Sequence, residues 1–175
     1  MKKSHYPLWY RLGSKDRYLI WYTVDVANED LDGVVLDSKG KIPIFVSLDA
    51  LSTYAQEEGI ALEHRALILH NLNVVAKRLT LKRSKPQGPT ALDCEAFLAA
   101  WNLFADVSRS TGASFDADRE RTNKIYDKLF WGNNIPAVTP EGKCYIPLWP
   151  RREKRIIHEV MSQGLRIFRG STKLR

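Results

Sequence analysis

Hydrophobic side chains in the first seventy residues are grouped as they are in strands. Residues 17–24 (RYLIWYTV) are rich in β-branched and aromatic side chains, which predicts a strand buried on both faces. The turn-forming segment 37–40 separates two apolar runs, and this pattern predicts a hairpin over residues 33–47. Another short strand is expected at residues 66–69. The N-terminal part of the chain therefore predicts an antiparallel sheet.

Helical spacing of apolar residues dominates the rest of the chain. The clearest case is residues 93–110, where one broad apolar stripe is expected to belong to the core: Phe97, Ala100, Trp101, Phe104 and Val107. Capping residues and glycines predict four other helices. Two are expected in the first half, at residues 49–58 with Ser47 or Asp49 as the cap, and from Asn71 or Asn73 to about Leu81. Two are expected in the second half, at residues 118–131 and at residues 150–163 between Pro150 and Gly164.

These elements predict one α+β domain over residues 1–175. An N-terminal antiparallel sheet of three to five strands is expected to pack against a C-terminal set of three to four helices. Residues 1–60 should be mainly strands with one helix, and residues 91–168 mainly helical. Residues 82–90 hold two prolines and one glycine, which predicts an exposed loop.

The composition supports a globular protein and excludes some classes. Hydrophobic residues make up 44% of the chain and charged residues 27%, as in ordinary globular domains. No apolar run is long enough to span a bilayer, and the N-terminus has no apolar segment of the secretory type. The two cysteines, Cys94 and Cys144, lack redox or metal spacing. We therefore expect a cytoplasmic protein with no membrane contact.

The formal net charge of +7 is concentrated in two segments, residues 65–85 and 151–175. Clustered basic residues form the electrostatic footprint of a nucleic-acid partner or an acidic protein partner. A nucleic-acid-binding module using these segments is thus one alternative. Neither segment interleaves aromatic residues with lysine and arginine as base-stacking proteins do, so nucleic acid is not the expected partner.

Candidate catalytic and ligand-binding groups are scattered along the chain. The histidines lack the spacing that places two metal ligands on one helical face, and no glycine-rich nucleotide motif is present. Cys94 lies near the start of a helix that is apolar along one side, where a buried inert thiol is expected. We expect no enzyme, no metal, no cofactor and no small-molecule ligand.

The segment from residue 125 to 149 combines aromatic residues, prolines and paired asparagines with few charges. Its order predicts a helix, a left-handed end at residues 132–134, a buried turn, and a proline that starts the next helix. We interpret it mainly as scaffold. Trp131 is its strongest candidate for a binding residue, because tryptophan is enriched at the energetic centres of interfaces.

Two resemblances to known families add to this picture. Residues 21–59, ending in IPIFVSLDALSTYAQEEG, resemble the N-terminal region of SseB-like proteins. The strings AFLAAWNLFADVSRS and IYDKLFWGNNIPAVTPEGKCYIPLW, followed by a helix ending in GLRIF, resemble bacterial immunity proteins of contact-dependent growth inhibition and other polymorphic toxin systems. This second resemblance covers residues 66–168, and its specific parts are WNLF and DKLFWGNNIPAVTP.

The resemblance to immunity proteins implies an inhibitor that binds a cognate toxin domain, the C-terminal domain of a large secreted effector, and protects the producing cell. The resemblance to SseB-like proteins implies an adaptor or chaperone that binds another protein. The partner-binding candidates are an acidic set and a set of one tryptophan and three arginines: Asp25, Glu29, Asp30, Asp32 and Asp37, and Trp131, Arg151, Arg152 and Arg155. Acidic side chains would face a basic toxin, whereas the arginines would face an acidic one.

Overall fold

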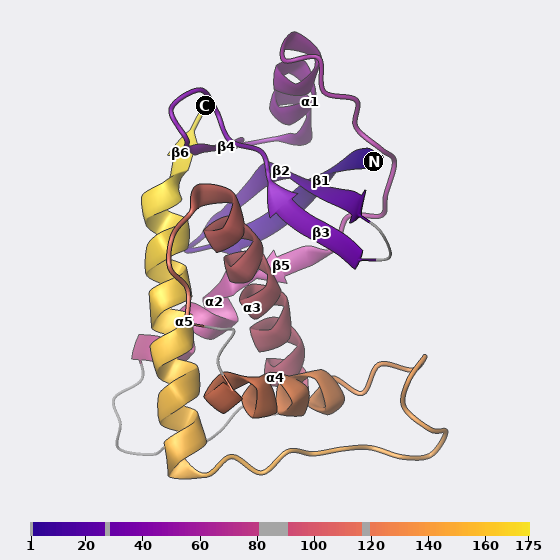
Figure 1. Cartoon of the computed structure of the whole chain (residues 1–175), viewed down its shortest axis with the longest axis vertical. Coiled ribbons are helices and arrows are strands. Elements are labelled where there is room, and N and C mark those ends of the chain that lie inside the picture. The colour runs from indigo at the N-terminus through magenta and orange to yellow at the C-terminus, as the bar shows by residue number, and fades with distance from the viewer. Residues whose placement is uncertain (1, 27–28, 81–90, 117–119) are drawn as a thin grey trace.

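A four-stranded mixed sheet forms the N-terminal part of the protein, and helices cover both of its faces (Figure 1). The computed structural model describes residues 2–26, 29–80, 91–116 and 120–175. The strand order is β3-β2-β1-β5, and the strands are β1 (Lys3–Leu12), β2 (Lys15–Val26), β3 (Glu29–Val34) and β5 (Leu69–Asn71). The first three strands are antiparallel, but β5 runs parallel to β1.

In the described residues, five helices and two further strands accompany this sheet in one α+β domain. The helices are α1 (Leu48–Glu57), α2 (Leu72–Thr80), α3 (Ala91–Thr111), α4 (Glu120–Gly132) and α5 (Arg151–Ser171). Strands β4 (Ile42–Ile44) and β6 (Thr172–Leu174) form a separate two-stranded parallel sheet, which attaches the C-terminus to the domain. None of the described helices combines the length and the apolar character that crossing a bilayer requires.

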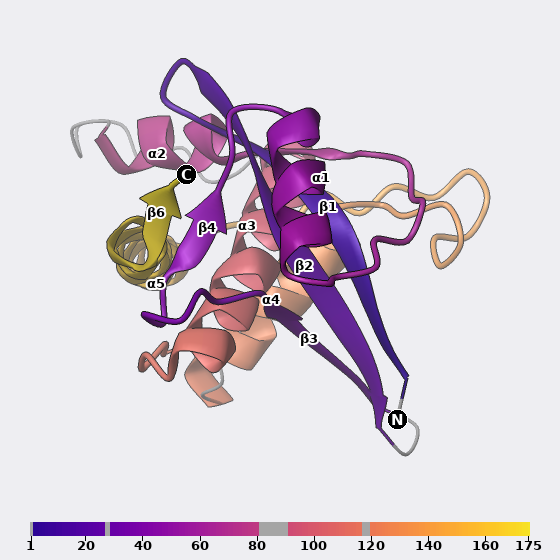
Figure 2. The same ribbon diagram turned by 90° about the horizontal axis from the view of Figure 1, so that it is seen from above.

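The main core lies between the sheet and helices α3 and α5. The stripe predicted on α3 is buried along its whole length, which confirms its assignment to the core. Strand β2 is buried on both faces, because Leu19 packs into this main core while Ile20 packs under α1 with Phe45 and Leu51. In Figure 2, α1 and α3 lie on opposite sides of β1 and β2.

Most predicted helix starts and ends are confirmed. The Ser47 side chain accepts a hydrogen bond from the backbone N–H of Ala50 and caps α1, and Gly59 follows with a positive φ of 67°. The Asn71 side chain accepts a bond from the N–H of Asn73 at the start of α2. Gly112, with φ 68°, follows α3. The loop expected at residues 82–90 lies outside the described residues.

Two predictions about strand pairing and helix length were wrong. Residues 37–40 do form a turn, but β3 pairs with β2 whereas β4 pairs with β6, so residues 33–47 are not a hairpin. Gly164 does not end the last helix, which continues to Ser171. A β-carbon at Gly164 would lie 2.2 Å from the Phe104 ring, so this glycine serves the packing of α5 against α3.

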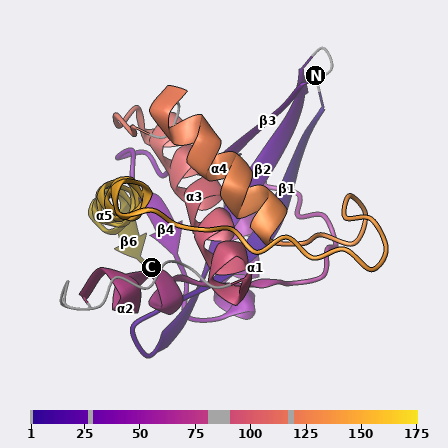
Figure 3. The same cartoon turned by 90° about the horizontal axis from the view of Figure 1, so that it is seen from below.

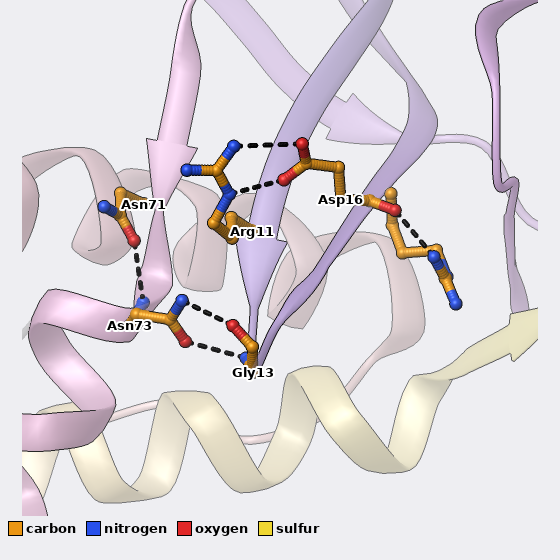
Figure 4. A network of polar contacts seen from close by, with 6 residues as sticks. Arg11, Gly13, Asp16, Asn71 and Asn73 are labelled. Carbon is orange, nitrogen blue, oxygen red and sulfur yellow. Dashed lines mark hydrogen bonds and ion pairs between the residues drawn. The ribbon is translucent and has the colours of Figure 1, made fainter.

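The turn between β1 and β2 is held against α2 by a network of polar contacts (Figure 4). The side-chain amide of Asn73 donates to the carbonyl of Gly13 at 2.6 Å and accepts from its N–H at 2.7 Å. Arg11 and Asp16 form an ion pair across the same hairpin. Gly13 has φ 72°, a conformation that glycine adopts without strain. A single side chain therefore satisfies both backbone groups of this turn residue.

Replacing Asn73 with alanine should lower the free energy of unfolding by about 1–2 kcal/mol, since two hydrogen bonds to Gly13 are lost. Urea denaturation measures the change. Ser14→Ala, at an exposed position in the same turn, is the matched control and should change stability by less than about 0.5 kcal/mol. Equal effects of the two substitutions would contradict a fastening role for Asn73.

Candidate protein-binding surface

The chain between α4 and α5 extends away from the body of the protein and returns beside α4 (Figures 1 and 3). We call residues 133–149 the arm. Asn134, with φ 50°, is the one non-glycine residue with positive φ in the described chain, and it turns the arm out of α4. Its side chain accepts from the N–H of Tyr145 at 2.7 Å and donates to the Tyr145 carbonyl at 3.0 Å. These two bonds tie the outgoing and returning parts of the arm together.

The returning part of the arm follows the last turns of α4 closely. A β-carbon at Gly132 would lie 2.9 Å from Pro147, so only glycine allows this approach. Lys128 donates to the carbonyl of Leu148 at 3.2 Å and forms an ion pair with Glu153 of α5 at 2.7 Å. Trp149 is buried beside them. The arm is thus anchored at its base by α4 and α5.

Large apolar side chains are exposed along this anchored arm and at the adjoining end of α4. They are Trp131, Val138, Tyr145, Ile146 and Leu148, with exposed fractions of 49, 47, 42, 70 and 83%. Pro147 and Leu148 lie against Gly132 and Lys128 in the last turns of α4, and Tyr145 is bonded to Asn134 just after the helix. We call these five side chains the apolar surface of the arm.

The interpretation of this segment as mainly scaffold holds only for part of it. Ile125 and Leu129 are buried on α4, and residue 134 has the left-handed geometry expected there. The turn predicted to be buried is instead exposed at Pro136, Ala137 and Val138. Its apolar composition therefore belongs to the surface of the protein.

The predicted arginines begin α5, directly after the arm. Arg151, Arg152 and Arg155 are all exposed in the first turns of this helix, and Arg155 lies 3.8 Å from Glu159. Cations in the first turn of a helix oppose the helix dipole, so Arg151 and Arg152 bring no electrostatic benefit to the helix itself. The arginines follow the returning end of the arm, whereas Trp131 lies at the end of α4 where the arm begins.

Four residues of the predicted acidic set belong to the paired strands β2 and β3, whereas Asp37 lies apart from them. Asp25 is exposed at the end of β2, opposite Asp30 of β3 in the strand register. The side chains of Glu29 and Asp30 lie outside what the structure describes. Asp32 lies further along β3, where its carbonyl accepts a bond from Arg109. Asp37 lies in the separate turn before β4.

Asp37 has a role inside the fold. Its carboxylate accepts bonds from the N–H groups of Lys39 and Lys41 and from Arg175, and its side chain is 2% exposed. These contacts, the N–H of Lys41 foremost, lower the pKa of Asp37. The residue joins the turn at 37–40 to the C-terminal residue of the chain.

The lowered pKa of Asp37 gives a pH-dependent contribution to stability. Such a carboxylate stabilises the fold above its unfolded pKa of about 4, and this contribution is lost as the pH falls through the lower folded value. Asp37→Asn should therefore lower the Tm at pH 7, and its difference from the wild type should shrink between about pH 4 and pH 2. Calorimetry at several pH values checks this, with exposed Asp127→Asn as the control. A difference that is independent of pH would contradict it.

A hollow of about 590 Å³ lies on another part of the molecule, and it was missed in the sequence. The segment before β5 pairs with β1 at two points, Leu62 with His5 and Leu69 with Trp9. Between these points it has more residues than β1 and bends away from it. We call residues 63–68 the arch. Pro7 lies in this gap on the edge toward the arch, where it has no N–H to donate. A proline in the middle of strand β1 is the sequence feature that indicates this gap in the pairing.

The wall of the hollow opposite this gap is formed by α3 and α4. Asp106 of α3 is buried there and accepts bonds from Trp21 Nε1 at 2.9 Å and from Arg109 at 3.1 Å. Burial raises the pKa of Asp106, despite these two bonds. Among the predicted partner-binding residues whose side chains the structure describes, Asp32 alone lines the hollow.

Other candidate groups have structural environments. Cys94 is buried in the core, and burial raises the pKa of its thiol to about 11, so the thiol is protonated at neutral pH. Within the described ranges, no group of three or more His, Cys, Asp and Glu side chains is arranged to hold a metal ion. The basic segment 65–85 is described only to Thr80, and Arg78 in it lies 3.7 Å from Asp93.

Comparisons with known proteins give a fold relationship. No family model matches the chain, and a search of curated proteins also finds no match. The crystal structure of the SatS C-terminal domain in complex with bromine is similar, with a TM-score of 0.50 and 13% identity over 98% of this chain and 94% of that one. At this identity the similarity shows a shared fold alone. The resemblances to immunity proteins and SseB-like proteins stay predictions.

Proposed function

We propose that this protein binds the toxin domain of a secreted effector and neutralises it by forming a stoichiometric complex. The apolar surface of the arm is the observation that carries this proposal. Soluble proteins rarely group exposed large apolar side chains, and such groups mark sites of protein–protein interaction. The strings DKLFWGNNIPAVTP and IPLW, which carry the resemblance to immunity proteins, coincide with α4, the arm and its base.

The construction of the arm supports a binding role. Its two sides are joined by the Asn134 side chain and its base is held by Lys128, so the base of the arm loses less conformational freedom on binding. Specific interfaces combine an apolar centre with polar surroundings. The exposed Arg151, Arg152 and Arg155 follow the arm in the chain, and they would suit a toxin domain with an acidic surface beside its apolar contact.

Co-expression with the toxin domain encoded beside this protein tests the proposal. We expect growth to be restored, the two proteins to co-purify at a 1:1 ratio, and toxin activity in vitro to fall to zero at one molar equivalent. Failure of the purified pair to bind would contradict the proposal. Binding to a neighbouring protein without any effect on toxicity would favour the adaptor or chaperone alternative, and salt-dependent binding to RNA or DNA alone would favour the nucleic-acid alternative.

A further inference from the structure

We infer that the hollow beside Asp106 is a second binding site, and that it receives the ammonium or guanidinium group of a lysine or arginine side chain of the partner polypeptide. This inference rests on the proposed function only for the source of the cation. The site lies between β1, β2, α3 and α4, and its position differs from that of the arm. Its chemistry follows from three features: its aromatic wall, its buried carboxylate and the cation that already lies at its edge.

Two aromatic pairs line the hollow. Tyr6 and Trp21 are cross-strand partners in β1 and β2, with ring centroids 5.6 Å apart. Trp101 of α3 and Tyr126 of α4 form the other pair, at 5.9 Å. Tyr6, Trp21 and Tyr126 are only partly buried. The faces of such rings attract cations, and attraction strengthens where water is partly excluded.

Two carboxylates and two guanidinium groups line the hollow, and the buried charged group among them is the Asp106 carboxylate, to which Arg109 donates at 3.1 Å. Asp106 is buried at the wall, and Asp32 is the second lining carboxylate. The two lining arginines, Arg109 and Arg65, are both exposed. His70 also lines the hollow, and burial lowers the pKa of its imidazole, so it is neutral at pH 7.

The chain itself already places a cation on this aromatic wall. The guanidinium of Arg65, on the arch before β5, lies 5.5 Å from the centre of the Tyr6 ring. Arg65 is exposed, so a cation from another molecule is able to replace it. The arch exists because Pro7 interrupts the pairing of β1 with the segment before β5, so the same interruption opens the hollow and brings Arg65 to its edge.

Titration with small cations tests the site without any toxin domain. The probes are N-acetyl-lysine methylamide and its arginine counterpart, and the neutral control is N-acetyl-norleucine methylamide. Trp21 Nε1–H donates to Asp106, so its NMR signal reports directly on the carboxylate. We expect this signal to shift with saturation in the millimolar range, while exposed Trp131 reports non-specific association. Equal shifts with the norleucine probe, or no selective shift, would overturn the inference.

Substitutions at Asp106, Tyr6 and Arg65 measure what each side chain contributes to binding of the lysine probe. Asp106→Asn should weaken lysine binding at least tenfold, and Tyr6→Leu, which keeps apolar bulk but removes the ring, should also weaken it. Arg65→Gln should strengthen binding about threefold by removing the competing cation. Tyr6→Leu and Arg65→Gln decide the matter if Asp106→Asn does not fold. Unchanged affinity in the folded variants would overturn the inference.

The full toxin domain then identifies the source of the cation. In the complex, the Trp21 signal should shift and the lysine probe should no longer bind. If the complex forms but the lysine probe still binds in the hollow, the inference that a side chain of the partner occupies it would be wrong. The site would then be assigned to a free organic cation. A chain that binds the probes but not the toxin domain would refute the proposed function, while the site for a cation would stand.

Discussion

Gly164→Ala should lower the free energy of unfolding by about 3 kcal/mol, although alanine favours a helix over glycine by about 1 kcal/mol. The added β-carbon would lie 2.2 Å from Phe104 Cδ2 and 2.6 Å from its Cγ. Phe104 is fully buried and is packed edge-on against Phe115 and tilted against Phe168, so its ring has no free space to move into. Helices α3 and α5 must therefore separate to admit one methyl group.

Gly170 provides a matched control in the same helix. A β-carbon there would meet nothing within 4 Å, so Gly170→Ala should gain the helix preference and raise stability by up to about 1 kcal/mol. Urea denaturation of both variants measures the difference, and their changes should have opposite signs. Two stabilising substitutions would contradict the close packing of α3 and α5.

Leu148→Ser should weaken binding to the toxin domain by about a hundredfold while leaving the Tm nearly unchanged. Leu148 is 83% exposed, so its apolar area contributes little to folding, but it lies on the apolar surface of the arm beside the α4 end that carries Trp131. Residues at the centre of an interface commonly contribute 2 kcal/mol or more to binding. Trp131→Ala should have an effect at least as large, because tryptophan contributes the largest contact area.

Leu31→Ser is the matched control for Leu148→Ser. Leu31 is a second exposed leucine, on β3 between Asp30 and Asp32. Binding measured by calorimetry should be unaffected by this change if the arm is the interface. A loss of binding with Leu31→Ser and none with Leu148→Ser would move the interface to β3 and would favour the acidic set as the partner-binding residues.

The local elements of the fold were accessible from the sequence because they depend on neighbouring residues. The cap at Ser47, the glycine after α3 and the apolar stripe with Phe97 at its start all act within a few positions, and each is confirmed. Strand β1 was missed, because its mixture of polar and aromatic residues lacks a clear run, and Pro7 argues against a central strand. Its pairing with β2 supplies the stability that its own sequence does not indicate.

The binding surfaces required the tertiary structure. The apolar residues of the arm have the composition of a core, and only the positions of α4 and α5 show that Ile146 and Leu148 remain exposed. The hollow joins residues 6, 21, 65, 106 and 126 from separate elements. The acidic set is spread along residues 25–37, and the structure pairs its members on β2 and β3 but places Asp37 in the separate turn before β4.

The sequence by itself determined the α+β class, the helices of the C-terminal half and the core stripe of α3, because periodicity and capping are local properties. Tertiary structure alone decided that Gly164 is a packing residue, that β4 pairs with β6, and that Asp106 meets Trp21 across 85 positions of sequence. It also decided which apolar residues are exposed, since burial depends on what covers a side chain. The covering segments are distant in sequence, and the periodicity of apolar residues does not specify how such segments are arranged.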